Sequence, residues 1–149
     1  MSAGKRDRGS LGIFGGTFDP IHMGHLRAAQ EVAEELELAK VLFMPCADPP
    51  HAKVVRAPAA MRLEMAHLAV MNNPRFAISD LEVACGGKSY AVDSLCEMAR
   101  QHPYRPLYWL IGADAFFNLH TWYQPQRLLG LADFVVMTAP ARAATCSPT

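Results

Sequence analysis

The chain has 149 residues, enough for one domain with a substantial hydrophobic core. Hydrophobic residues make up 51% and charged residues 19%, a balance that is typical of globular proteins and excludes a disordered chain. The 14 basic side chains equal the 14 acidic ones, so no overall field draws the chain to nucleic acid or to an anionic membrane, and we expect neither partner.

The opening segment MSAGKRDRGS is basic, and the apolar run after it, LGIF, is too short for a signal peptide or a membrane span. We therefore expect residues 1–10 to form a flexible tail on a cytoplasmic protein. The four cysteines contain no C-x-x-C pair, which favours free thiols in a reducing compartment.

Apolar patterns predict alternating strands and helices from residue 11 onward. LGIF at 11–14 is typical of a buried strand that ends at Gly15 and Gly16. A helix is expected to start near Gly24, because apolar residues recur at helical spacing over 26–36. KVLFMP then predicts a second strand.

The alternation continues to the end of the apolar sequence. A helix follows Pro58, with Met61, Met65 and Leu68 expected as its buried stripe. A later helix would be capped by or near Ser89. The remaining elements expected are strands at 76–83, 106–112 and 133–138 and helices at 91–101, 113–119 and 124–132.

Strands that alternate with helices predict an α/β fold, a Rossmann-like, doubly wound parallel sheet with helices on both faces. Such sheets bind ligands beyond the carboxyl ends of their strands, where the strand order reverses. We expect a single domain over residues 11–138. The last segment, 139–149, shows no helical or strand period and is expected to be a disordered tail.

The segment GIFGGTFDPIHMGH, residues 12–25, has the composition of a phosphate-binding turn. Gly15 and Gly16 would permit positive φ and let a ligand approach the backbone. The free N–H groups at the start of the following helix favour an anion, and His22 and His25 would stand at its mouth as donors. The alternatives are a plain tight turn or a zinc site, although no third metal ligand is evident nearby.

Several motifs carry a resemblance to a known family. GGTFDPIHMGH, which contains His22-Met23-Gly24-His25, resembles the signature of the H-x-G-H nucleotidyltransferase superfamily. MPCADPPHAK, RLEMAHLA, SYAVDSL and LIGADAFFNLHTWYQPQRLL resemble, in order, motifs of bacterial nicotinate-nucleotide adenylyltransferases. The resemblance implies a nucleotidyltransferase fold and transfer of AMP from ATP to nicotinate mononucleotide, giving deamido-NAD and pyrophosphate.

The resemblance implies that His22 and His25 are catalytic, holding the ATP phosphates and stabilising the transition state. The nucleophile is already an anionic phosphate, so alignment and charge neutralisation suffice without a general base. Mg²⁺ is expected to arrive with ATP, bound by phosphate oxygens and water and by no protein side chain. Asp114 would accept from a ribose hydroxyl, or else cap a short helix. The ATP-binding residues implied are Gly15, Gly16, Thr17, Phe18, Gly24, Gly112 and Asp114.

A second site would hold nicotinate mononucleotide. Trp122 is expected to stack on the pyridine ring, for which an indole face is suited, and N–H groups near Ala91 and Tyr123 would receive the carboxylate. Trp109 is expected in the core instead. The residues implied for this site are His51, Lys53, Ser89, Tyr90, Ala91, Trp122 and Tyr123. His51 and Lys53 would meet phosphate, although Ala52 separates them where the family usually has adjacent residues.

The chain departs from the family after DFVVMT. Family members commonly continue with a further strand, an S-x-T-x-x-R motif and terminal helices, whereas this chain has APARAATCSPT. The sequence thus predicts a core that folds without the family's C-terminal elements, with very low catalysis. Two alternatives remain: a non-catalytic nucleotide-binding remnant, and another H-x-G-H adenylyltransferase such as the phosphopantetheine enzyme. The sequence leaves open whether the chain forms a homo-oligomer.

Overall fold

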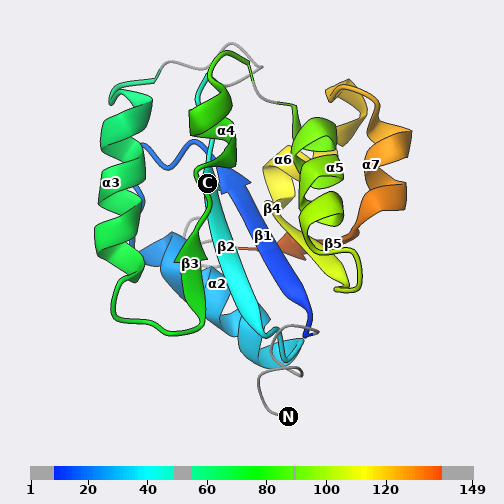
Figure 1. Ribbon diagram of the computed structural model, residues 1–149, viewed down its shortest axis with the longest axis horizontal. Coiled ribbons are helices and arrows are strands. Elements are labelled where there is room, and N and C mark those ends of the chain that lie inside the picture. Colours follow the sequence, from blue (N-terminus) through cyan, green and yellow to red (C-terminus); the bar gives the residue numbers. More distant parts are fainter. Residues whose placement is uncertain (1–8, 49–54, 89, 139–149) are drawn as a thin grey trace, which may run out of the picture.

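Five parallel strands form the sheet at the centre of the structure, a computed structural model that describes residues 9–48, 55–88 and 90–138. Their order is β3-β2-β1-β4-β5, so the first strand lies in the middle and the strand order reverses beside it (Figure 1). The parallel α/β sheet predicted from the sequence is confirmed. The strands are β1 (Leu11–Gly16), β2 (Lys40–Pro45), β3 (Phe76–Ile78), β4 (Leu107–Gly112) and β5 (Asp133–Met137).

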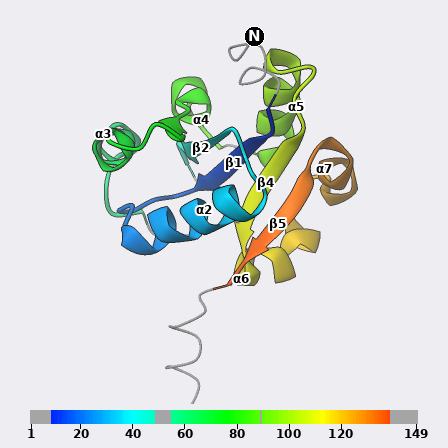
Figure 2. The same ribbon diagram turned by 90° about the horizontal axis from the view of Figure 1, so that it is seen from below.

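Helices connect successive strands and cover both faces of the sheet. Figure 2 shows α2 and α5 on opposite sides of the sheet, and Figure 1 shows α3 alongside the β3 edge. The helices are α2 (Met23–Glu35), α3 (Ala59–Val70), α4 (Leu81–Cys85), α5 (Ala91–Gln101), α6 (Ala113–Phe117), the 3-10 helix η1 (Leu119–Thr121) and α7 (Pro125–Leu131).

Two hydrophobic clusters fill the two faces, because successive strand residues point to opposite sides of a sheet. Trp109 is 4% exposed within the first cluster, so its expected place in the core is confirmed. The first cluster, against α5 and α7, includes Leu11, Ile13, Met44, Val92, Leu95, Met98, Trp109 and Leu128. The second cluster, against α2 and α3, includes Phe14, Phe18, Ala29, Ala33, Val41, Phe43, Val70, Phe76 and Leu110.

The buried face of α3 differs from the predicted stripe. Met61 is 53% exposed and Leu68 is 63% exposed, so the expectation that they line the core is wrong. The interior face consists of residues spaced by four, Arg62, Ala66 and Val70. Arg62 sets the orientation of α3 about its own axis, because its guanidinium finds backbone carbonyl acceptors only inside the protein.

The strand predicted over 76–83 is shorter than expected. β3 ends at Ile78, and α4 begins three residues later at Leu81. Between them the hydroxyl of Ser79 accepts a hydrogen bond from the N–H of Leu81 at 3.3 Å. Ser and Asp side chains favour such turns and helix starts over strands, and the Ser79-Asp80 pair therefore ends the strand.

The edge strand β5 is apolar but poorly covered. None of its residues is buried, and Val136 is 40% exposed. Phe134 packs against the first cluster, while Val135 and Met137 pack against the second. Among the described residues β5 pairs only with β4, so its outer edge carries backbone groups without a strand partner.

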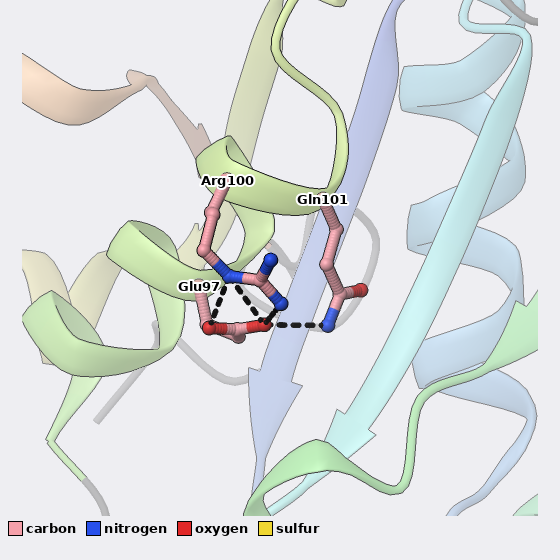
Figure 3. A network of polar contacts seen from close by, with 3 residues as sticks. All are labelled: Glu97, Arg100 and Gln101. Carbon is pink, nitrogen blue, oxygen red and sulfur yellow. Dashed lines mark hydrogen bonds and ion pairs between the residues drawn. The ribbon is translucent and has the colours of Figure 1, made fainter.

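A polar network lies on the surface of α5. Glu97 accepts hydrogen bonds from Arg100 and Gln101, one turn further along the helix (Figure 3). The Arg100 guanidinium, followed by the Gln101 amide, lowers the pKa of Glu97 to about 2. Such exposed pairs at helical spacing support the helix locally and contribute little to the stability of the whole fold.

The predicted tails at 1–10 and 139–149 lie outside the described residues, apart from Gly9 and Ser10. The carbonyls of these two residues accept hydrogen bonds from Arg105 and Ala39. The described cysteines, 46, 85 and 96, are free thiols, as expected. In the part of the chain that the structure describes, no helix is long and apolar enough to span a membrane.

Candidate functional site

The turn between β1 and α2 lies at the carboxyl edge of the sheet, where the strand order reverses. β1 continues through Gly15 and Gly16, and neither glycine uses the positive φ that glycine permits. A Cβ on Gly15 would approach the Trp109 ring to 2.7 Å, so this glycine is required by core packing. The left-handed residue of the turn is Phe18, with φ 48°.

His22 and His25 are held by hydrogen bonds at the start of α2. His22 is the N-cap residue, and its Nδ1 accepts a hydrogen bond from the N–H of Gly24 at 3.1 Å. The Nδ1 of His25 accepts a hydrogen bond from the N–H of His22, also at 3.1 Å. The two histidines therefore take the places that Ser or Thr and Glu fill in an ordinary capping box.

These hydrogen bonds decide which ring nitrogen carries the proton. An Nδ1 that accepts from a backbone N–H carries no proton, so the neutral ring bears its hydrogen on Nε2. The two rings stack with centroids 3.7 Å apart and planes at 25°. The helix start therefore presents two Nε2–H donors side by side, beside the positive end of the α2 dipole.

Gly24 is the residue that lets His22 cap the helix. A Cβ at this position would lie 2.9 Å from Cε1 and Nδ1 of the His22 ring. A larger residue at position 24 would push the His22 imidazole away from the backbone N–H of that residue, from which Nδ1 accepts a hydrogen bond. The glycine of the H-x-G-H segment is thus explained by the cap itself.

Aromatic rings support His25 from behind. The His25 ring lies edge-on to Phe18, with centroids 5.0 Å apart, and to Phe14 at 5.9 Å. Phe14 and Phe18 in turn contact Phe43 of β2. This packing leaves the imidazole few orientations, which fixes the direction of its Nε2–H donor.

A cavity of about 410 Å³ opens in front of the two imidazoles. It combines backbone of the turn with donors of three kinds, namely imidazole, guanidinium and the helix start. Its lining residues are Phe14, Gly16, Thr17, Phe18, Asp19, Pro20, His22, His25 and Arg56. The predicted residues Gly16, Thr17 and Phe18 are thus brought together with both histidines. Asp19 and Arg56 are members that the sequence analysis does not identify.

Asp19 links this turn to the segment before α3. Its Oδ2 accepts a hydrogen bond from the N–H of Arg56 at 2.5 Å, and its Oδ1 accepts one from the N–H of Ala57 at 3.0 Å. The hydrogen bond from Arg56 is the largest cause that lowers the pKa of Asp19 below its usual 3.8, with further contributions from Ala57, Arg62 and the Arg56 charge. The carboxylate is therefore ionised at neutral pH and engaged by the backbone.

Arg62 ties three segments together from inside the protein. Its side chain is 0% exposed, and its guanidinium donates to four backbone carbonyls. The acceptors are Ala57 O at 2.9 Å, Thr17 O at 2.8 Å, Cys46 O at 2.8 Å and Ala47 O at 3.0 Å. A planar fork with several N–H groups suits this task, because it can satisfy separate carbonyls at fixed angles. The turn after β1, the end of β2 and the segment before α3 are thus fixed relative to one another.

The described residues of the predicted nicotinate site also lie together. The rings of Tyr90 and Tyr123 have centroids 5.0 Å apart. Tyr90, Ala91 and Trp122 all pack against the first hydrophobic cluster. Trp122 is half-buried and Tyr123 is 51% exposed. His51, Lys53 and Ser89, the other residues predicted for this site, lie outside the described residues.

Gly112 and Asp114 lie where β4 meets α6. β4 pairs directly with β1, so both residues are at the same sheet edge as the histidine turn. Asp114 is exposed in the first turn of α6, and its carboxylate makes no capping hydrogen bond there. The alternative expectation, that Asp114 caps this helix, is therefore wrong.

Comparison with known proteins decides the family. Residues 13–148 match the cytidylyltransferase-like family. The chain belongs to the cytidylyltransferase-like family. Its relatives there include proteins named "Probable nicotinate-nucleotide adenylyltransferase", as the motifs predict. One, from Desulfatibacillum aliphaticivorans, is 47% identical over 131 residues, which are 87% of this chain and 60% of the relative. Another, from a strain of Thermus thermophilus, is 48% identical over 130 residues, 87% of this chain and 69% of the relative.

Solved structures agree on the fold of this cytidylyltransferase-like chain. A Plasmodium falciparum nicotinic acid mononucleotide adenylyltransferase, solved as a complex with NaAD, aligns with a TM-score of 0.70 at 16% identity. The alignment covers 87% of this chain and 75% of that one. The chain thus has the nucleotidyltransferase fold and spans about three fifths of the length of the first curated relatives it matches, 60% and 63%.

The sequence analysis of this cytidylyltransferase-like chain does not identify Arg62 and Arg56 as residues of the site, for different reasons. Arg62 does carry a signal, because it stands four residues before Ala66 and eight before Val70, on one helical face. Arg56 carries none, since its place on the cavity wall depends on Asp19, which is 37 residues away in the sequence.

Proposed function

We propose that the chain transfers the AMP part of ATP to nicotinate mononucleotide, giving deamido-NAD and pyrophosphate. The observation that carries this proposal is the stacked histidine pair at the start of α2, whose two rings line a cavity at the carboxyl edge of the sheet. The names of the relatives support the choice of substrates. ATP would lie with its phosphates against His22 and His25 and its nucleoside toward Gly112 and Asp114.

The chemistry follows from the arrangement of donors. The phosphate of nicotinate mononucleotide is an anion and attacks the α-phosphorus of ATP without prior loss of a proton. Negative charge then develops on the phosphate oxygens, and fixed N–H donors stabilise that charge without reorganising. His22 and His25 supply these donors, and their Nδ1 hydrogen bonds hold them in place.

Mg²⁺ is proposed to enter with ATP and to neutralise phosphate charge. Among the residues described, no three His, Cys, Asp or Glu side chains are grouped as metal ligands. The one carboxylate on the cavity wall, Asp19, already accepts two backbone N–H groups. The described residues therefore do not form a protein cage for the ion, and we assign it no step.

The nicotinate end is proposed to lie among Tyr90, Ala91, Trp122 and Tyr123. The indole of Trp122 would cover the flat pyridine ring, and backbone N–H groups near Ala91 and Tyr123 would receive the carboxylate. Tyr90 and Tyr123 lie in contact, which supports a shared site for these two segments of the chain.

Pyrophosphate release by the purified 149-residue chain tests the proposal. The assay contains ATP, Mg²⁺ and nicotinate mononucleotide, with nicotinamide mononucleotide and phosphopantetheine as competing substrates. We expect pyrophosphate release that requires nicotinate mononucleotide. We expect the His22→Ala, His25→Ala double variant to lose this release. ATP binding without turnover would support a nucleotide-binding remnant instead, and preferred use of phosphopantetheine would reassign the substrate.

A further inference from the structure

Arg56 lies on the wall of the same cavity as the two histidines. Its side chain is exposed, and within the described part of the chain its guanidinium donates no hydrogen bond. Asp19, whose charge interacts with that of Arg56, accepts hydrogen bonds at both of its oxygens from the N–H groups of Arg56 and Ala57. Arg56 is therefore a cationic lining residue of the cavity, and the described residues do not use its guanidinium donors.

The backbone at Arg56 is fixed from two sides. Asp19 accepts both successive N–H groups of the segment, and Arg62 donates to the carbonyl of Ala57 at 2.9 Å. Asp19 belongs to the same turn as His22, three residues earlier. The arginine and the histidines are thus anchored to one turn, and their spacing does not depend on a flexible loop.

A triphosphate ligand would carry more negative charge than neutral imidazole donors can balance, and a cationic side chain would offset it. Two imidazoles that accept at Nδ1 are neutral donors, whereas a triphosphate carries several negative charges. A guanidinium is permanently charged and offers paired N–H groups that match two phosphate oxygens. Asp19 would repel a phosphate, but its charge is offset by two N–H groups and by Arg56 and Arg62.

We infer that Arg56 is a third phosphate-binding side chain of this site and that Asp19 is its positioning residue. The ligand is the polyphosphate of a nucleoside triphosphate. The identity of the nucleotide in this inference rests on the proposed function. The binding of the polyphosphate anion does not. Arg56 contacts the phosphates directly, and Asp19 acts only by holding the backbone of Arg56 at the cavity.

Calorimetric titration of the full chain with inorganic triphosphate, ATP and adenosine tests the inference. Arg56→Ala is expected to weaken inorganic triphosphate and ATP by about tenfold or more, the scale of a hydrogen bond to a charged group, and to leave adenosine unchanged. Arg56→Lys should keep part of the affinity. The matched control is Arg27→Ala, which removes the same charge from an exposed part of α2 beside Glu31.

Asp19→Asn tests positioning. The substitution should weaken the binding of inorganic triphosphate, because it frees the Arg56 backbone. It also removes a negative charge, and on electrostatic grounds alone that removal would strengthen anion binding. An Arg56→Ala variant that binds triphosphate as well as Arg27→Ala would overturn the inference, as would tighter binding by Asp19→Asn. Arg56-dependent triphosphate binding without release of pyrophosphate from ATP and nicotinate mononucleotide would uphold the inference and refute the proposed function.

Discussion

His22 and His25 each have two ring nitrogens with separate tasks. The Nδ1 atoms complete the start of α2. The Nε2–H groups are the donors that we propose for the phosphates. A substitution to alanine removes both tasks at once and cannot distinguish them. Asparagine places its side-chain oxygen close to the position of Nδ1 and offers nothing at Nε2, so it separates the two.

His22→Asn should therefore keep the fold and lose the chemistry. Asparagine is among the best N-cap residues, so the free energy of unfolding of His22→Asn should stay near that of the wild type. His22→Ala should lose about 1 kcal/mol of it. Both variants should lower kcat by roughly two orders of magnitude, the scale of one preorganised donor. Urea unfolding and steady-state kinetics measure the two effects. A change confined to KM would show that the transition-state role is wrong.

Asp19 predicts a pH dependence of stability. Its hydrogen bonds from Arg56 and Ala57 lower its pKa in the folded state below 3.8. A carboxyl group with a depressed pKa stabilises the fold above its unfolded value, and this contribution is lost as the pH falls through the folded value. Wild type should therefore exceed Asp19→Asn in Tm at pH 7, and the difference should shrink only below about pH 4. A Tm difference that is the same at pH 3 and pH 7 would contradict this.

At the scale of single residues, the sequence predicts where the two histidines lie better than it predicts why the glycines are there. The H-x-G-H spacing places both imidazoles at one helix start, and the structure has them stacked there. Gly15, by contrast, is explained by the Trp109 ring of another strand, and Gly24 by the His22 ring itself. Such reasons depend on contacts across the fold, which a local pattern does not contain.

Among the elements, α3 contributes most to the shape of the site through one side chain. Arg62 connects the turn after β1, the end of β2 and the segment before α3, all by donation to carbonyls. A buried carbonyl that loses its donor costs about 1–3 kcal/mol. The arginine is thus a structural part of the site, although it faces away from the solvent.

Arg62→Met should destabilise the protein by roughly 3 kcal/mol or more, because four carbonyls lose their donor, at about 1–3 kcal/mol for each that stays buried and unpaired. Arg62→Lys keeps the charge but replaces the planar fork by a single ammonium, so its loss should be intermediate. Urea unfolding of both variants measures this. Equal stability of Arg62→Lys and wild type would show that the geometry of the fork is unimportant.

The elements themselves are largely predictable, and the two errors have physical causes. Strand and helix periods depend on burial, and burial is read from hydrophobicity. That reading fails at α3, where an arginine is inside and Met61 and Leu68 are outside. It fails again after Ile78, where a Ser-Asp pair ends an apolar strand and a short helix continues the apolar sequence.

At the scale of the whole molecule, β5 is the exposed end of the sheet. Its outer edge has no strand partner among the described residues, and its apolar side chains are only partly covered. Edges of this kind promote pairing between copies, and a lysine on the edge suppresses it.

We expect the chain to self-associate at high concentration, and Val136→Lys to reduce this. Sedimentation velocity over a range of concentrations measures the association. Leu68→Lys is the matched control, because it removes an exposed apolar side chain from α3, beside the opposite edge of the sheet. An equal reduction by both variants would point to general hydrophobicity and not to the β5 edge.

The central position of β1 has a consequence for the order of events during synthesis. β1 emerges from the ribosome first, and β2, α2, α3 and β3 can cover one of its faces early, since most of the second hydrophobic cluster comes from residues 14–76. Its other edge must wait for β4, at residues 107–112. Until then Gly15 lacks the Trp109 ring that packs against it. The turn after β1 is therefore synthesised well before the strand that completes its packing, and it can take its final shape only after β4 has been made.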